Sequence, residues 1–228
     1  MILGLFSDIH ANLRAFDACL AHARAEGVDQ VAVLGDLVGY GAEPCEVMDR
    51  VMALAAEGAQ VVKGNHDVLA ASLPRAEAVT MDALASVWTR TQLEPWHCAY
   101  IDQLPYTVQI GDCLLVHAGA EAPERWHYVD DSRSASASLD AAVQSGQVRH
   151  VFGGHVHHQT LYYRGAGRGL MSFTPTAGVP IPLARHRQWI ATVGSVGQPR
   201  DGDNRAMYAV FDTDKARLTF FRVPYDHH

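Results

Sequence analysis

The sequence predicts an α/β protein in which parallel strands alternate with helices. Short apolar segments typical of strands recur up to about residue 158, and segments with helical spacing lie between the early ones. Each apolar segment ends abruptly in Gly or Ser, or directly in a residue that can bind a metal ion. Strands and helices in alternation are typical of βαβ units, which build a largely parallel sheet.

The first helices are predicted from periodicity and from their end signals. Apolar residues recur at helical spacing over 13–26, with Asn12 as the expected N-cap and Gly27 as the expected stop. A second helix is expected to begin near Pro44 and to end before Gly58. The strands expected around these helices cover 2–6, 31–34 and 60–63.

Residues 72–103 read as two helices inserted between strands. In the first of them, Val79, Leu84 and Val87 share one helical face, which we expect to be buried. We expect this insertion to cover the edge of the sheet or the functional site.

The sequence pattern changes after residue 158. Short strand-like segments are separated there by Gly, Pro and Asp, which predicts antiparallel hairpins, the last of them turning at 212–215. No repeat and no linker divides the sequence, so residues 1–228 are interpreted as a single domain.

Composition limits the classes of partner. The chain has 228 residues, 48% of them hydrophobic, with a formal charge of −7 and no basic stripe, so there is no strong nucleic-acid signal. A small phosphate-bearing substrate stays compatible with this charge, because bound cations can reverse the local field. No apolar stretch approaches the roughly 20 residues that cross a bilayer. The four scattered cysteines form no C-x-x-C pair, which favours buried thiols and a cytoplasmic location.

Polar residues that can bind metal ions follow five of the predicted strands. Because the carboxyl ends of parallel strands share one edge of a sheet, we expect these side chains to meet there. The candidate ligands are Asp8, His10, Asp36, Asn65, His117, His155 and His157, with His66 next to them.

Seven nitrogen and oxygen ligands are too many for one tetrahedral ion and suit two ions with open positions for water. A carboxylate is the natural bridge, with each oxygen serving one cation. Two metals about 3.5–4 Å apart are the usual arrangement for phosphoryl hydrolysis. The ligand types admit Mn, Fe, Zn, Ni or Co.

These motifs, in this order, resemble those of the calcineurin-like metallophosphoesterases. The matching stretches are D8-x-H10, GD36LVGYG, GNH66D, a strand-ending His117 and GGH155-V-H157. The stretch GSVGQPRDGDNRA over 194–206 resembles a segment of the small bacterial phosphodiesterase-type members. The resemblance implies a four-layer α/β/β/α sandwich of two mixed sheets flanked by helices.

The resemblance also implies a role for each residue. Asp8, His10 and His157 would hold the first metal ion, and Asn65, His117 and His155 the second. Asp36 would bridge the two ions. His66 would bind no metal; it would donate a hydrogen bond to the phosphate and protonate the leaving oxygen.

One departure from the family bears on the substrate. Protein serine/threonine phosphatases usually have an Asp and a phosphate-clamping Arg where this chain has Gly39 and Tyr40. This difference disfavours a dedicated protein phosphatase. Tyr40 either contacts a substrate ring or packs in the fold. Arg200 and Arg205 either contact phosphate or form surface salt bridges.

The sequence therefore predicts a metal-dependent phosphoric ester hydrolase with two divalent cations. The expected reaction is attack of a metal-bridging hydroxide on small phosphodiesters, nucleotide-like ones included. Two alternatives stay open: a phosphomonoesterase or nucleotide pyrophosphatase, including protein phosphatase activity, with the same site, and a non-catalytic metal-binding scaffold. The presence of His66 favours an enzyme over a scaffold. The oligomeric state is left open.

Overall fold

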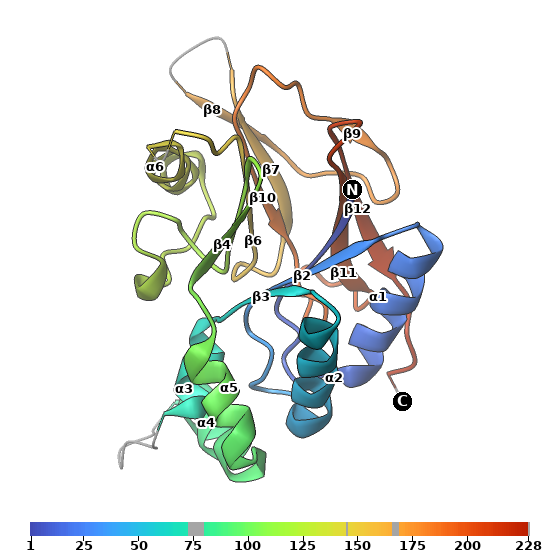
Figure 1. The fold of residues 1–228 in the computed structure, drawn as a ribbon, viewed down its shortest axis with the longest axis vertical. Helices are drawn as coiled ribbons and strands as arrows, with labels where there is room; N and C mark the ends of the chain where they lie inside the picture. Colours follow the sequence, from blue (N-terminus) through green and yellow to red (C-terminus); the bar gives the residue numbers. More distant parts are fainter. Residues whose placement is uncertain (73–79, 145, 166–168, 228) are drawn as a thin grey trace.

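The chain folds into two six-stranded mixed sheets that pack face to face, with helices on both outer faces (Figure 1). The computed structural model describes residues 1–72, 80–144, 146–165 and 169–227. The arrangement confirms the expected α/β/β/α sandwich. None of the helices described is long and apolar enough to cross a membrane.

The first sheet joins the beginning and the end of the chain, in the order β3-β2-β1-β11-β12-β9. Strands β1, β2 and β3 are parallel, and β11 runs antiparallel to β1, with Leu3 opposite Phe211. Its strands are β1 (Ile2–Phe6), β2 (Gln30–Leu34), β3 (Gln60–Val62), β9 (Ile181–Pro182), β11 (Ala206–Asp212) and β12 (Arg217–Val223). Helices α1 (Leu13–Ala25) and α2 (Pro44–Ala56) cover its outer face.

The second sheet has the order β4-β5-β6-β10-β7-β8. Strands β5, β6 and β10 are parallel to one another, while β4, β7 and β8 are antiparallel to their neighbours. Its strands are β4 (Thr107–Ile110), β5 (Cys113–Val116), β6 (His150–Gly153), β7 (Gln159–Arg164), β8 (Leu170–Phe173) and β10 (Trp189–Val193). Helix α6 (Ser132–Val143) covers the outer face, and a short 3₁₀ helix, η1 (Pro123–Arg125), precedes it.

Strand alternation divides the core into layers. Side chains on a strand point alternately to its two faces. In β1, Leu3 and Leu5 therefore lie between the sheets, while Phe6 packs under the helices beside Phe16. Because both faces of β1 are buried, its sequence is a nearly continuous apolar run rather than an alternating one.

The predicted elements agree with the structure apart from two points: β10, expected in an antiparallel hairpin, also pairs parallel with β6, and one helix buries a different face. Region 72–103 contains α4 (Met81–Gln92) and α5 (Pro95–Gln103), which follow α3 (Asn65–Ala71). The expectation for α4 was wrong: Leu84 is 51% exposed, whereas Ser86 and Thr89 are buried. Helix α4 packs against α3 and α2, so tertiary contacts rather than apolar periodicity decide which of its residues are buried. Val79 lies outside the described residues.

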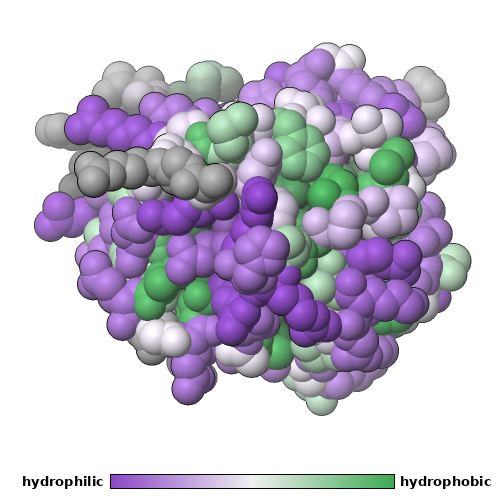
Figure 2. Space-filling view, turned by 90° about the horizontal axis from the view of Figure 1, so that it is seen from above, coloured by the Kyte–Doolittle hydropathy of each residue, from purple (hydrophilic) through white to green (hydrophobic). Residues whose placement is uncertain are grey.

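Helices α3, α4 and α5 gather at the lower end of the sheets in Figure 1. The strand β1 runs toward this end, so the loops at the carboxyl ends of the parallel strands lie there. Figure 2 looks onto the opposite end, where hydrophilic side chains dominate the middle of the surface.

Candidate metal centre

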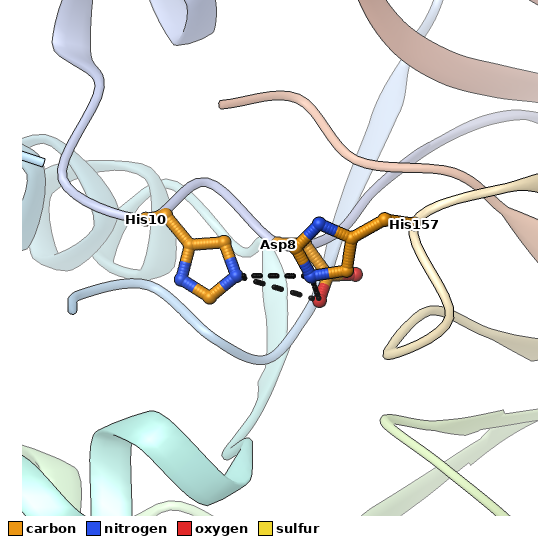
Figure 3. A group of neighbouring side chains, drawn as sticks. All are labelled: Asp8, His10 and His157. Carbon is orange, nitrogen blue, oxygen red and sulfur yellow. Dashed lines mark hydrogen bonds and ion pairs between the residues drawn. The ribbon is translucent and has the colours of Figure 1, made fainter. Parts of the chain in front are cut away.

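Asp8, His10 and His157 form the first group of potential metal ligands, in the loops that follow β1 and β6 (Figure 3). His157 Nε2 lies 3.1 Å from Asp8 Oδ1 and 3.2 Å from His10 Nε2. His10 Nε2 lies 3.8 Å from the same carboxylate oxygen. All three side chains are buried, and their donor atoms point toward one another.

Asp36, His117 and His155 form the second group. His117 Nε2 lies 3.3 Å from Asp36 Oδ2, 3.2 Å from His155 Nδ1 and 3.2 Å from Asn65 Oδ1. The structure thus brings together all seven residues that the sequence proposed as ligands.

Asp36 connects the two groups through a single oxygen. Its Oδ2 lies 3.3 Å from His117 Nε2 and 3.8 Å from His10 Nε2. Its Oδ1 accepts a hydrogen bond from the backbone N–H of His66 at 2.9 Å. The geometry therefore differs from the expected bridge with one oxygen for each cation, because Oδ1 is already engaged by the backbone.

Backbone carbonyls orient three of the imidazoles. The Nδ1 atoms of His10, His117 and His157 lie 3.3, 2.7 and 2.6 Å from the carbonyl oxygens of Val38, Leu34 and Gln198. A carbonyl only accepts, so each Nδ1 carries the hydrogen and Nε2 is left for a metal ion. In the neutral tautomers, the lone pairs of His10 and His157 face each other at 3.2 Å, a contact that a cation between them would relieve. The donor set therefore fits metal ions.

Burial and neighbouring charges favour the ligating protonation states of Asp8, Asp36, His10 and His155, but not that of His117. Burial acts to raise the pKa values of Asp8 and Asp36, but the adjacent imidazoles outweigh it and hold both pKa values well below the usual range. Burial lowers the pKa of His10 and of His155 to about 4, which keeps both rings neutral at pH 7. Burial opposes protonation of His117, but Asp36 raises the pKa of this ring to about 10, so a bound cation would displace a proton there.

His66 lies beside the donor groups but belongs to neither. It is buried on α3, its ring lies 5.1 Å from that of His10, and its Nδ1 has no hydrogen-bond partner among the described residues. Tyr40 lies against both rings, 4.9 Å from His10 and 4.6 Å from His66. The Arg200 guanidinium lies 6.0 Å from the Tyr40 ring centre, while Arg205 pairs with Asp203 at 2.6 Å.

The ligand-bearing loops adopt unusual backbone conformations. Positive φ angles between 49° and 67° occur at five of the seven ligands: Asp8, His10, Asp36, His155 and His157. Such conformations cost about 1–3 kcal/mol each and cluster at functional sites. Glycines permit the close approach of these loops, since a Cβ on Gly64 would lie 2.2 Å from Asp36 Oδ1.

Two supporting groups were missed by the sequence reasoning. Both oxygens of the buried Asp67 accept backbone N–H groups, from Leu37, Val38 and Gly64, and so tie the loop after β2 to the start of α3. The Ser195 hydroxyl donates to the Asp8 carbonyl at 2.8 Å. The signals were present in GNHD and GSVG, where Asp67 follows Gly64 by three positions and Ser195 follows Gly194 directly.

A cavity of about 650 Å³ adjoins the first donor group. His10 and Tyr40 form one side of it, and Arg14, Glu43 and Tyr225 contribute elsewhere to the lining. Its volume lies in the range of pockets that hold small organic ligands.

Three comparisons relate the chain to known proteins. A family model described as calcineurin-like phosphoesterase superfamily domain matches residues 1–216. An uncharacterised protein of Methanocaldococcus jannaschii is 29% identical over 230 residues, which cover 99% of this chain and 88% of that protein. The crystal structure of a metallophosphoesterase from Sphaerobacter thermophilus is similar at a TM-score of 0.84 and 34% identity, over 99% of this chain and 90% of that one. A hypothetical protein from Pyrococcus horikoshii shares the fold at a TM-score of 0.76 and 18% identity, over 99% and 89%.

Proposed function

Because the chain belongs to the calcineurin-like phosphoesterase superfamily, we propose that it hydrolyses small phosphodiesters with the help of two divalent cations. The observation that supports this most is the position of Asp36 Oδ2, which faces both groups of buried donor atoms. A carboxylate oxygen shared in this way suits a pair of neighbouring cations better than one isolated ion.

The donor groups divide the ligands between the two cations. Asp8, His10 and His157 would hold one, Asn65, His117 and His155 the other, and Asp36 both. When bound, such cations acidify a water and neutralise charge on the phosphate oxygens.

His66 is proposed to protonate the leaving oxygen. Its backbone N–H is fixed by Asp36 and its ring rests against Tyr40, so the imidazole is held next to the donor groups without joining them. The orphaned Nδ1 shows that its hydrogen-bonding capacity is not used by the described residues. A general acid of this kind contributes about 10²–10⁴-fold in rate.

The surroundings favour a small diester over a phosphoprotein. The chain has Gly39 and Tyr40 where a protein phosphatase would have an Asp and an Arg. The cavity beside His10 gives room for a second ester group, and Arg200 lies over Tyr40 at its border. We also propose a cytoplasmic location, in keeping with four cysteines that are all free.

The test compares bis(p-nitrophenyl) phosphate with p-nitrophenyl phosphate after loading the protein with Mn²⁺. The expected result is faster turnover of the diester, with activity lost in His66→Ala for substrates with poor leaving groups. A strong preference for the monoester would replace our proposal with a phosphomonoesterase. Metal-loaded protein that hydrolyses neither ester, with no change in His66→Ala, would instead support a non-catalytic scaffold.

A further inference from the structure

A third group of potential metal ligands lies at the other end of the second sheet, and we propose that it binds a thiophilic divalent cation of the zinc type. The group consists of Asp112, Cys113 and His150, whose donor atoms all lie within 4.8 Å of one another. It shares no residue with the candidate metal centre and does not depend on the proposed phosphoesterase activity.

Strand pairing brings these three residues together. Cys113 begins β5 and His150 begins β6, and the two are register partners in this parallel pair. Their side chains therefore project from the same face of the sheet. The carbonyl oxygen of Asp112, in the turn before β5, accepts hydrogen bonds from the backbone N–H groups of Arg149 and His150. Asp112 is thus fixed next to His150.

The donor distances fit tetrahedral coordination. His150 Nδ1 lies 3.5 Å from Asp112 Oδ1, and Cys113 Sγ lies 3.7 Å from the same oxygen. With ordinary zinc bond lengths, a tetrahedral site separates nitrogen from oxygen by about 3.4 Å and sulfur from oxygen by about 3.6 Å. Small movements would therefore place a cation between the three donors.

His150 carries the second, independent observation. It is only 4% exposed, yet its Nε2 has no hydrogen-bond partner among the described residues, and its Nδ1 makes no hydrogen bond of good geometry and has the 3.5 Å ion-pair contact with Asp112 Oδ1. Buried polar atoms are rarely left in this state. Burial also lowers the pKa of this ring, which favours the neutral form that binds metals. The ring borders a cavity of about 830 Å³, lined in part by Asp112, that offers an entry path.

The charges around the group suit a thiolate complex only once a cation is bound, because burial and the neighbouring Asp112 raise the pKa of the Cys113 thiol. Arg149 and Arg185 line the same cavity and would repel a lone dication. Binding would displace the proton of the Cys113 thiol, so that one thiolate, one carboxylate and one dication sum to zero charge. The arginines then face a neutral complex. Sulfur and imidazole donors select zinc-like cations over magnesium or calcium.

The site is distinct from the candidate metal centre because the two lie at opposite ends of the same strands. Strand β6 leads from His150 at its amino end to His155 and His157 beyond its carboxyl end. Its four residues span roughly 13 Å. A cation here would join the β4–β5 turn to the segment entering β6, which is a stabilising rather than a catalytic position.

Cadmium titration tests the proposal, since cadmium bound to a thiolate gives an ultraviolet charge-transfer band that the nitrogen and oxygen ligands of the other centre do not give. In protein whose candidate metal centre is already loaded with Mn²⁺, we expect Cd²⁺ to produce this band in the wild type, Cys113→Ser to abolish it, and Zn²⁺ to compete it away. Cys45→Ser and Cys98→Ser, the matched controls, should keep the band. Its absence from the wild type, or its survival in Cys113→Ser, would overturn the proposal.

A substitution at the surface keeps the proposal testable if the buried Cys113→Ser variant does not fold. Asp112 is half-exposed in a turn, so Asp112→Asn should fold normally and weaken Cd²⁺ binding by at least about tenfold. Unchanged Cd²⁺ affinity in this variant would contradict the three-ligand site. If the wild type ignores Cd²⁺ but binds inorganic phosphate in a manner that Arg185→Ala abolishes, the cavity is an anion site and the metal proposal fails.

Discussion

Substituting Gly154 by alanine tests whether the donor groups depend on close backbone approach. Gly154 lies between the end of β6 and His155. A Cβ added there would lie 1.8 Å from Ser7 Oγ and 2.3 Å from Asp8 Oδ2, whereas ordinary van der Waals contacts begin near 3.4 Å. The Asp8 carboxylate accepts a hydrogen bond from His155 through this same oxygen, so it has little freedom to move.

The expected effect follows from the size of this overlap. Asp8 must shift by about 1 Å to clear the new methyl group, while metal-ligand distances tolerate only about 0.2 Å. We therefore expect Gly154→Ala to lose the cation held by Asp8, His10 and His157. Overpacking of this kind costs about 1–3 kcal/mol, which lowers the Tm of a chain this long by roughly 2–12 °C.

The assay combines elemental analysis of Mn²⁺-loaded protein, thermal denaturation and hydrolysis of bis(p-nitrophenyl) phosphate. Gly169→Ala is the matched control, because a Cβ there meets no atom of the described residues within 4 Å. Full metal content together with full activity in Gly154→Ala would refute the reasoning. Equal losses in both alanine variants would also refute it.

Three further predictions concern the same centre. Replacing His66 by Gln should lower kcat by about 10²–10⁴-fold for substrates with alkyl leaving groups and far less for those that release p-nitrophenolate. The metal content should stay unchanged. Equal losses of kcat for the two kinds of substrate would contradict proton donation by His66. Metal at 100 times its Kd stabilises the folded protein by about 2.7 kcal/mol, so removing it with a chelator should lower the Tm by roughly 5–11 °C. Differential scanning calorimetry should show no such shift for Asp36→Asn. In metal-free protein, the pKa values of about 4 for His10 and His155 lie below the usual 6.5, so the unfolded chain binds more protons between these values. Stability should therefore fall as pH drops from 6.5 to 4. The urea midpoint of His10→Gln should change less over this pH range than that of the wild type, and an equal change in both proteins would contradict this explanation.

The general position of the site could be predicted in part from strand direction, since parallel strands bring their carboxyl ends to one edge of a sheet. Asp36 follows β2 in the first sheet and His117 follows β5 in the second, so their separation of 3.3 Å also requires the two sheets to pack with these edges together. Strand direction alone does not give that alignment. The four-layer arrangement came from the family resemblance, since apolar periodicity does not state which sheet a later strand joins.

Finer features depended on tertiary contacts that no local pattern encodes. The engagement of Asp36 Oδ1 by the backbone of His66 requires two loops to be placed within hydrogen-bond distance. The buried side of α4 is set by its packing against α3, so its apolar periodicity was misleading and Leu84 faces solvent. The juxtaposition of Cys113 and His150 comes from the β5–β6 register, which no local pattern encodes.

The ligands of the candidate centre are widely spread along the chain, so the centre can form only late in synthesis. Asp8 emerges early in synthesis, but His157 comes 149 positions later and is oriented by the carbonyl of Gln198. The complete set of donor groups therefore cannot form until nearly the whole chain is available, and any metal ion bound there would enter a nearly finished chain.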